Sequence, residues 1–267
     1  MKSQPALTIG LILSAFAAPM VAQISDADAA ASAYVDASSP ALKKDDGTFL
    51  RRHAEILARA KAGPIGLLFL GDSITAHWAD APHIWEAYFG KYQPANFGVA
   101  GDATQHVIWR IEHGELSGIH PRVVVLLAGT NNTATHSAAE ITAADKRIVE
   151  LIRKNIPEAK VLLLGIFPRG VRKLRDGSID TGAEKMKIIR AVNSELAQLD
   201  DGETIRYLDI GEKFLGQDGK IPFAIMPEQL HPNAAGYQLW ADAMKPLLDR
   251  MMGEPATGSS RGADLPH

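Results

Sequence analysis

The amino-acid sequence predicts an α/β domain in which a five-stranded parallel β-sheet lies between two layers of helices. Two observations predict this fold. Short apolar runs alternate along the chain with longer segments of helical period, and the runs are apolar at most positions, as in strands buried on both faces. The chain has 267 residues, of which 46% are hydrophobic, so it can bury one substantial core and fits one large domain.

Five apolar runs give the predicted strands. They read, in order, IGLLFL, the shorter ANFGV, VVVLLA, VLLLGI and IRYLDI. Their β-branched and large apolar residues are typical of strands. These strands are residues 65–70, 95–99, 123–128, 161–166 and 205–210.

Longer segments with apolar residues at helical spacing lie before, between and after the runs. They predict helices over residues 42–60, 83–92, 104–113, 138–155, 183–199 and 234–251. The resulting strand–helix alternation is typical of parallel strands joined by helical crossovers.

The two ends of the chain differ from its middle. Residues 1–22 carry one lysine, an apolar stretch too short to span a bilayer, and then small residues, as a secretory signal peptide does. Residues 23–40 predict a linker and residues 253–267 a flexible tail, which leaves residues 41–252 as the domain. We therefore expect a periplasmic or secreted protein with no stable membrane insertion after signal cleavage.

Composition excludes several classes of protein. The net charge is −3 and the basic residues form no runs, so nucleic acid is not an expected partner. The chain has no cysteine, which excludes a disulfide framework, a thiolate nucleophile, a cysteine zinc site and a lipid anchor on cysteine. Four histidines cluster in the sequence but lack metal-ligand spacing, so no metal site is expected: His77, His83, His106 and His113.

Polar residues follow the first three predicted strands. The loops read Gly71-Asp72-Ser73, Ala100-Gly101-Asp102 and Gly129-Thr130-Asn131-Asn132. Ligands of open parallel sheets bind outside the carboxyl ends of the strands. We therefore expect the chemistry at the edge of the sheet where these loops converge.

Ser73 is the candidate nucleophile. It lies at a strand-to-helix turn, where its hydroxyl can stand clear of the backbone and the helix N-terminus offers free N–H groups. The alternative interpretation is that Gly-Asp-Ser only forms a turn and a helix cap, because these residue types favour such positions for local reasons.

Gly101 and Asn131 are candidates for an oxyanion hole, together with the backbone N–H of Ser73. A glycine N–H can approach a substrate oxygen closely, and an asparagine amide can donate to the same point. Ester cleavage needs such donors where the tetrahedral oxyanion forms. Taken singly, a glycine turn and an asparagine cap explain the two residues equally well.

His231 is the candidate general base, because a serine nucleophile needs a base within hydrogen-bond reach. It lies in a loop just before the last predicted helix, and Glu228 precedes it by three residues. Glu228 can then receive the Nδ1 proton of His231 and hold the useful tautomer. The alternative is a surface histidine beside an incidental acid.

These four residues resemble those of the SGNH, or GDSL-type, serine hydrolases. Ser73, Gly101, Asn131 and His231 match the serine, glycine, asparagine and histidine that give the family its name. The wider blocks LGDSIT, NFGVAGD, LAGTNN and LGIFPRG are similar to the platelet-activating-factor acetylhydrolase catalytic-subunit branch, and the resemblance covers most of the chain after the signal.

The resemblance implies a flavodoxin-like three-layer sandwich with an open, shallow site. It also implies hydrolysis of short acyl, above all acetyl, esters without a metal or organic cofactor. With a signal peptide, acetylated carbohydrates are the expected substrates. The alternatives are a lipid or lysophospholipid acyl hydrolase, an acyltransferase, and a noncatalytic glycan-binding module; a homodimer is compatible with the sequence.

The chain departs from the family at Glu228, where the usual residue is aspartate. Its carboxylate lies one carbon–carbon bond, about 1.5 Å, further from the backbone. Three arrangements stay open: the loop shifts so that Glu228 pairs with His231, Ser73 and His231 act as a dyad, or another acid such as Asp218 approaches. We favour the first, because glutamate fills this role in related triads.

Other residues near the predicted site are candidates for substrate contact. Asp72 and Arg169 follow the first and fourth strands, although Asp72 also fits a structural role in its turn and Arg169 an exposed cap. Trp78, Trp85 and Trp109 can line an acyl or sugar pocket, and core packing is the alternative for at least two of them.

Overall fold

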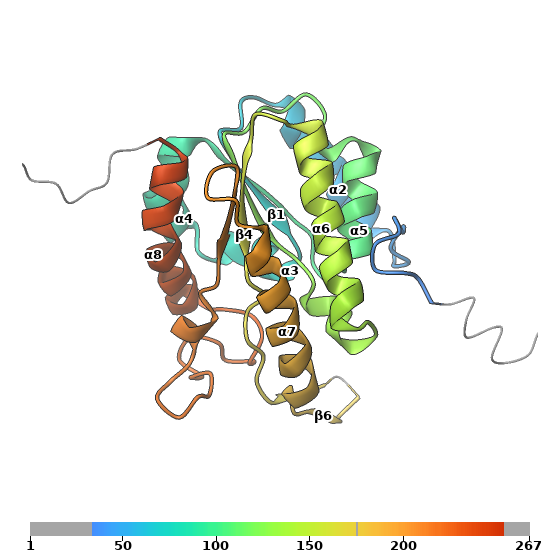
Figure 1. Cartoon of the computed structure of the whole chain (residues 1–267), viewed down its shortest axis with the longest axis vertical. Coiled ribbons are helices and arrows are strands. Elements are labelled where there is room, and N and C mark those ends of the chain that lie inside the picture. Colours follow the sequence, from blue (N-terminus) through green and yellow to red (C-terminus); the bar gives the residue numbers. More distant parts are fainter. Residues whose placement is uncertain (1–33, 175, 254–267) are drawn as a thin grey trace, which may run out of the picture. The chain divides into compact units, whose positions relative to one another are not determined.

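The computed structural model describes residues 34–174 and 176–253. Its main sheet consists of the strands β1 (Leu67–Gly71), β2 (Pro94–Gly98), β3 (Val123–Leu127), β4 (Lys160–Leu164) and β7 (Ile205–Leu208). All neighbours are parallel, and the spatial order is β2-β1-β3-β4-β7 (Figure 1). The predicted five-stranded parallel sheet is therefore confirmed.

Each central strand supplies both faces of the sheet. In β1, Leu68 and Leu70 belong to one hydrophobic cluster, whereas Leu67 and Phe69 belong to the other. Successive side chains of a strand point to opposite faces, so an apolar residue at every position fills two cores at once. This is why the runs in the sequence are continuous and not alternating.

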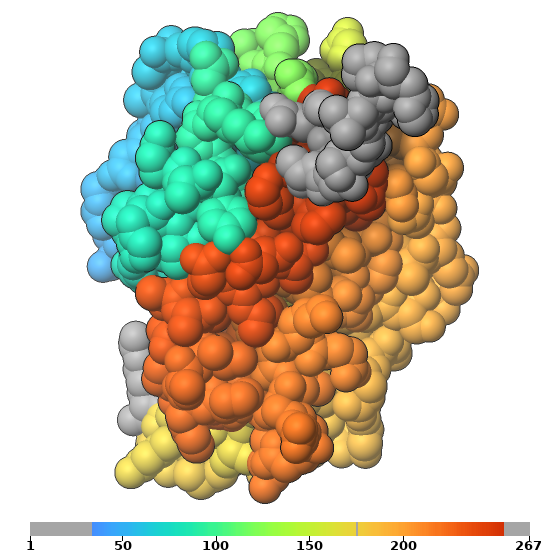
Figure 2. All heavy atoms as spheres, turned by 90° about the vertical axis from the view of Figure 1, so that its left-hand side faces the viewer, coloured from blue at the N-terminus to red at the C-terminus, as the bar shows by residue number. Residues whose placement is uncertain are grey.

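Helices cover both faces, as predicted (Figure 1). They are α2 (Thr48–Lys61), α3 (Ser73–Ala76), α4 (Pro82–Phe89), α5 (Thr104–Arg110), α6 (Ala138–Asn155), α7 (Ala183–Leu196) and α8 (Ala234–Met251). One face packs against α2, α5, α6 and α7, and the other against α4 and α8. Figure 2 looks onto the second face, where α8, in red, crosses the surface beside α4.

Two long helices have the predicted bounds because their caps are encoded locally. Ser137 accepts a hydrogen bond from the backbone N–H of Glu140, whose carboxylate accepts one from the N–H of Ser137. At the start of α8, the side chain of Asn233 accepts from the N–H of Gly236. Such caps satisfy N–H groups that the first helical turn leaves unpaired.

The first helix begins later than predicted, at Thr48 instead of residue 42. Asp45 and Asp46 accept hydrogen bonds from the backbone N–H groups of residues 47–49, and Gly47 has φ +85°. Aspartate side chains that bind the backbone two residues on favour turns over helix.

The linker prediction is wrong for its last residues. Ala37 is fully buried in the core, and its carbonyl accepts a hydrogen bond from Thr104 Oγ1 at 2.8 Å. The carbonyl of Val35 lies 2.8 Å from His136 Nε2. The compact unit accordingly begins at Val35, not at residue 41. This segment contains few large apolar residues, but the small side chain of Ala37 is still buried in the core.

The remaining predictions for the two ends lie outside the described residues: the signal peptide (1–22), the linker up to residue 33 and the tail after Gly253. Within the described part of the chain, no helix is long and apolar enough to cross a membrane.

An antiparallel ribbon that was not predicted lies between β4 and α7. It consists of β5 (Arg172–Lys173) and β6 (Ile179–Asp180), with Arg172 opposite Asp180. Strands of only two residues leave no periodic signal in a sequence.

Candidate active site

Ser73 is the first residue of α3, directly after β1. Asp72 caps this short helix by accepting a hydrogen bond from the N–H of Ile74 at 2.9 Å. The Ser73 side chain therefore stands at the carboxyl end of a central strand, as the sequence predicts, with backbone N–H groups of a helix start around it.

The structure brings His231 and Glu228 to this serine. Ser73 Oγ lies 2.8 Å from His231 Nε2, and Nδ1 of the same ring contacts a carboxylate oxygen of Glu228. Of the three arrangements left open by the sequence, this is the one in which Glu228 pairs with His231. Asp218 instead accepts a hydrogen bond from the N–H of Lys220 within its own turn.

The turn that carries Glu228 depends on Gln229. Its φ is +64°, in the left-handed region that few residues other than glycine adopt. The Gln229 side chain is buried and donates to the carbonyls of Ile221 and Met226, at 3.2 and 3.0 Å. Its own carbonyl accepts from Gly170 N at 2.9 Å. These bonds hold the turn in a conformation that places Glu228 beside His231.

Two further contacts near the histidine, made by Arg172 and His77, were not predicted. Arg172 Nη2 lies 3.0 Å from the second carboxylate oxygen of Glu228. His77 stacks on His231 with ring centroids 4.9 Å apart and planes 7° apart, and His77 Nδ1 lies 3.0 Å from Asp80. No spacing rule links residues so distant in the chain, so neither contact had a sequence signal.

The electrostatics of His231 favour the neutral imidazole. Burial lowers the pKa of His231 below its ordinary value, and the neighbouring His77 and Arg172 act in the same direction. The hydrogen bond and negative charge of Glu228 oppose this shift. A histidine that is neutral at physiological pH can accept a proton from serine.

Gly101 and Asn131 lie at the same edge of the sheet. Gly101 is exposed and has φ +71°, which glycine adopts without strain. Asn131 Nδ2 donates to the carbonyl of Asp102 at 2.8 Å, so the loops after β2 and β3 are directly joined. An asparagine amide carries two N–H bonds, of which this contact uses one.

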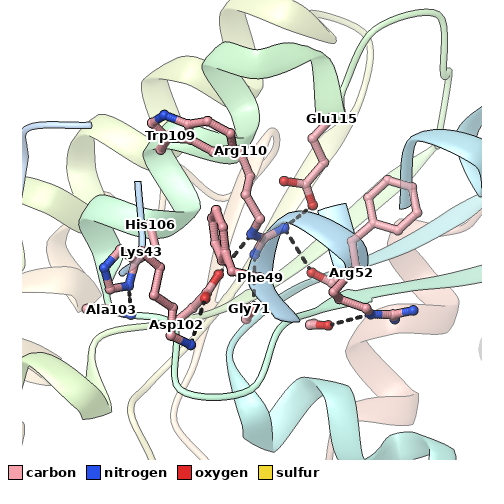
Figure 3. A network of polar contacts seen from close by, with 12 residues as sticks. Lys43, Phe49, Arg52, Gly71, Asp102, Ala103, His106, Trp109, Arg110 and Glu115 are labelled. Atoms are coloured by element: carbon pink, nitrogen blue, oxygen red, sulfur yellow. Dashed lines mark hydrogen bonds and ion pairs between the residues drawn. The ribbon is translucent and has the colours of Figure 1, made fainter. Parts of the chain in front are cut away.

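A buried ionic network underlies the loop that carries Gly101 (Figure 3). The guanidinium of Arg110 is fully buried and binds the carboxylates of Asp102, at 2.8 Å, and Glu115. It also donates to the carbonyls of Gly71, at 3.1 Å, and Phe97, at 3.2 Å. Arg110 thus ties together the carboxyl ends of β1 and β2, which carry Ser73 and Gly101.

Lys43 reaches this loop from the segment before α2. Its ammonium donates to the carbonyl of Ala100 and lies 3.6 Å from Asp102. The sequence singled out neither Lys43 nor Arg110, because an isolated basic residue in a helix or loop is normally a solvated one.

Asp72 has no exposed surface with which to contact a substrate, contrary to one of its predicted roles. It is fully buried, and burial raises its pKa to about 7. Asp145 of α6 is also buried, which raises its pKa well above the ordinary value. Asp72 is therefore a structural cap, in agreement with the alternative drawn from the sequence.

The tryptophans and Arg169 contact other groups of the protein. Trp78 is 1% exposed and packs in the core, Trp85 packs against the same cluster, and Trp109 packs against the other cluster and stacks on His113. The guanidinium of Arg169 donates to the carbonyl of Thr130 at 3.0 Å and pairs with Asp180. The burial of Trp78 agrees with core packing, the alternative drawn from the sequence.

The described residues contain no group of three or more histidine, aspartate or glutamate side chains that could hold a metal ion.

The parallel α/β sheet and the contact of serine, histidine and carboxylate at its carboxyl edge define the class of α/β serine hydrolases. The chain belongs to the GDSL-like lipase/acylhydrolase family, whose model matches residues 69–239. It is a serine ester hydrolase.

Known proteins similar to this chain agree with that assignment. Platelet-activating factor acetylhydrolase IB subunit alpha1 of Homo sapiens is 34% identical over 235 residues, which cover 86% of this chain and 95% of the human protein. The alpha2 subunit of Rattus norvegicus is 32% identical over 212 residues, covering 78% and 85%. The crystal structure of a GDSL-like lipase from Bacteroides thetaiotaomicron shares the fold, with a TM-score of 0.60 at 19% identity over 76% of this chain and 97% of that one.

Proposed function

We propose that the protein hydrolyses short-chain acyl esters, above all acetyl esters, through a Ser73–His231–Glu228 triad. The observation that carries this proposal is the 2.8 Å contact of Ser73 Oγ with His231 Nε2, together with the Glu228 carboxylate on the other ring nitrogen. Nucleophile, base and orienting acid are then within hydrogen-bond reach of one another.

In the proposed mechanism, His231 Nε2 takes the proton of Ser73 as Oγ attacks the acyl carbon. The imidazolium that forms is stabilised by Glu228 and then protonates the leaving alcohol. Water, deprotonated by the same ring, attacks the acyl-enzyme, and the carboxylic acid leaves as Ser73 regains its proton.

The tetrahedral oxyanion is assigned to the N–H groups of Ser73 and Gly101 and the second N–H of the Asn131 amide. The contact of Asn131 with the carbonyl of Asp102 supports this role, because it fixes the amide beside Gly101. Each such donor contributes about 2.7 to 4 kcal/mol to transition-state stabilisation.

For the alcohol part of the substrate, we propose a carbohydrate, in keeping with the expectation of a periplasmic or secreted protein drawn from residues 1–22. Preference for an acetyl group is supported by the similar proteins, whose names specify an acetylhydrolase.

An amphiphilic alcohol, as in a lysophospholipid, is a second candidate. A cavity of about 380 Å³ lies between the segment after β4 and the loop before His231. Val171, Ile221 and Phe223 give it apolar walls, and Arg190 and Lys220 line it with positive charge. Apolar walls with cations suit an amphiphile that carries an anionic group.

Release of p-nitrophenol from acetate, butyrate and octanoate esters tests the proposal, with the Ser73→Ala variant as control and a chelator present. Activity that is highest on acetate and lost in the variant supports an acetyl esterase, and acetylated glycans are then assayed for free acetate. Activity that rises toward octanoate favours the amphiphile. Formation of a new ester with an added sugar identifies a transferase, and no Ser73-dependent reaction contradicts ester hydrolysis and points to a binding module.

A further inference from the structure

The carboxylate that faces His231 comes from an exposed side chain. Glu228 is 49% exposed, against 21% for His231. The turn at Gln229 fixes the backbone of Glu228 but not the end of its side chain. Glutamate has one torsion more than aspartate, and an exposed side chain in water populates several rotamers. A second contact is needed to hold the carboxylate on the ring.

Arg172 supplies that second contact. One oxygen of Glu228 faces His231 Nδ1, and the other accepts from Arg172 Nη2 at 3.0 Å. The two oxygens are therefore engaged by different donors on opposite sides. The Arg172 side chain is only 18% exposed, so its position is restricted by its surroundings.

The ribbon of β5 and β6 in turn holds Arg172. Its partner in the ribbon, Asp180, accepts from Gly182 N at 3.0 Å and forms ion pairs with Lys185 and, at 3.5 Å, Arg169. Just before the ribbon, Gly170 N donates to Gln229 O. The ribbon is thus fixed both to α7 and to the loop that carries Glu228.

We propose that Arg172 is a positioning residue that holds the Glu228 carboxylate against His231 although it touches no reacting atom, and that β5 and β6 contribute only by holding Arg172 in place. This inference rests on the proposed triad. It also accounts for the use of glutamate at this position, because the longer side chain reaches Arg172 and His231 at once.

The charged neighbours of His231 give the ion pair a second effect. Glu228 stabilises the imidazolium, whereas Arg172 and His77 disfavour it. Replacing Arg172 removes a positive charge near the ring and also frees the Glu228 carboxylate to move away from His231. A control variant that removes a nearby positive charge without touching Glu228 shows how much of the change in kcat is due to charge alone.

The test compares Arg172→Gln with Lys173→Gln, which removes the same charge from the next, exposed residue of the ribbon. We expect Arg172→Gln to lower kcat for p-nitrophenyl acetate about tenfold with KM nearly unchanged, because an interaction made in the transition state is lost. Lys173→Gln should leave kcat unchanged, and Arg172→Lys should recover part of the loss. Circular dichroism at the assay temperature corrects each rate for the folded fraction.

A double-mutant cycle then tests whether Arg172 acts through Glu228. In a Glu228→Gln background, Arg172→Gln should cost less than about twofold, because residues that act as a unit are non-additive. An equal loss in both backgrounds, or wild-type kcat in Arg172→Gln, overturns the inference. If Ser73→Ala and Glu228→Gln lose activity but Arg172→Gln keeps full activity, only the role of Arg172 is refuted. If Ser73→Ala keeps activity, the triad itself is refuted.

Discussion

At the scale of single residues, the candidate acid of the site is a glutamate, whose side chain is one carbon longer than that of aspartate. Glutamate stands at position 228, where the family resemblance implies aspartate; Gln229 next to it adopts a left-handed backbone conformation, and Arg172 contacts the Glu228 carboxylate. A non-glycine residue in that region costs about 1 to 3 kcal/mol. Buried hydrogen bonds of the Gln229 side chain offset this cost.

Replacement of Glu228 by glutamine tests the acid. We expect Glu228→Gln to lower kcat about a hundredfold or more, with little change in KM, because the imidazolium loses its counter-charge and the wrong tautomer is favoured. Glu158→Gln, on an exposed loop, is the matched control. Unchanged turnover in Glu228→Gln would remove Glu228 from the mechanism.

The pH profile gives a second readout of the same residue. The wild-type rate should fall on the acidic side with an apparent pKa below the ordinary histidine value of 6.5, because burial disfavours the charged ring. Since Glu228 raises the pKa of His231, its replacement should move this acidic limb to still lower pH. A shift to higher pH in Glu228→Gln would contradict the assigned contact.

At the scale of elements, the loops that carry the chemistry are held by structure that the sequence did not reveal. The bounds of α6 and α8 and the existence of all five sheet strands follow from caps and apolar period, which are local properties. Ser73, Gly101, Asn131 and His231 follow from local motifs. The contact of Arg172 with Glu228 joins positions 56 residues apart, and Arg172 lies in a two-residue strand, so no local pattern encodes the contact.

Gly170 links the ribbon to the catalytic loop and offers a test at this scale. A methyl group at this position would overlap the buried side chain of Gln229, including its Cβ, so the loop must move. We expect Gly170→Ala to lower kcat about tenfold and to reduce stability by about 1 to 3 kcal/mol, the usual cost of overpacking. Thermal melting and ester hydrolysis measure the two effects.

The control for this variant is Gly216→Ala, whose added methyl meets nothing closer than 3.2 Å. If Gly170→Ala melts and turns over as Gly216→Ala does, the close approach of Gly170 to Gln229 does not position the loop.

At the scale of the whole molecule, ionisable groups are buried beneath the catalytic edge. Asp72, Asp145 and Glu115 are essentially inaccessible, and burial raises the pKa of each. Among the described residues, Asp145 has no hydrogen-bond partner for either carboxylate oxygen. A raised pKa in the folded state means that folding binds a proton the unfolded chain releases, so these groups lower stability as pH rises from about 4.

Asp145→Asn removes one such group while keeping its shape. We expect the variant to melt at a higher temperature than the wild type at pH 8. At that pH the buried carboxyl group of Asp145 either carries a charge or keeps a proton that the unfolded chain releases, and both cost free energy of folding. At pH 4, close to the ordinary aspartate pKa, the difference should be small, because the carboxyl group of the unfolded chain has only partly released its proton. Calorimetry at both values of pH checks this, and an equal shift at both would assign the effect to packing alone.

The contacts of Ala37 and Lys43 set a limit on how far the N-terminus can be trimmed. Ala37 is buried in the core, where its carbonyl binds Thr104 of α5, and Lys43 donates a hydrogen bond to the carbonyl of Ala100, next to Gly101. A protease that cuts between residue 22 and Val35 leaves both in place, whereas a cut after Lys43 removes a core residue and the lysine contact together. The stretch ahead of α2 therefore connects the core to the loop of Gly101, and we expect a chain shortened past Lys43 to lose activity whereas one that begins at Val35 keeps both contacts.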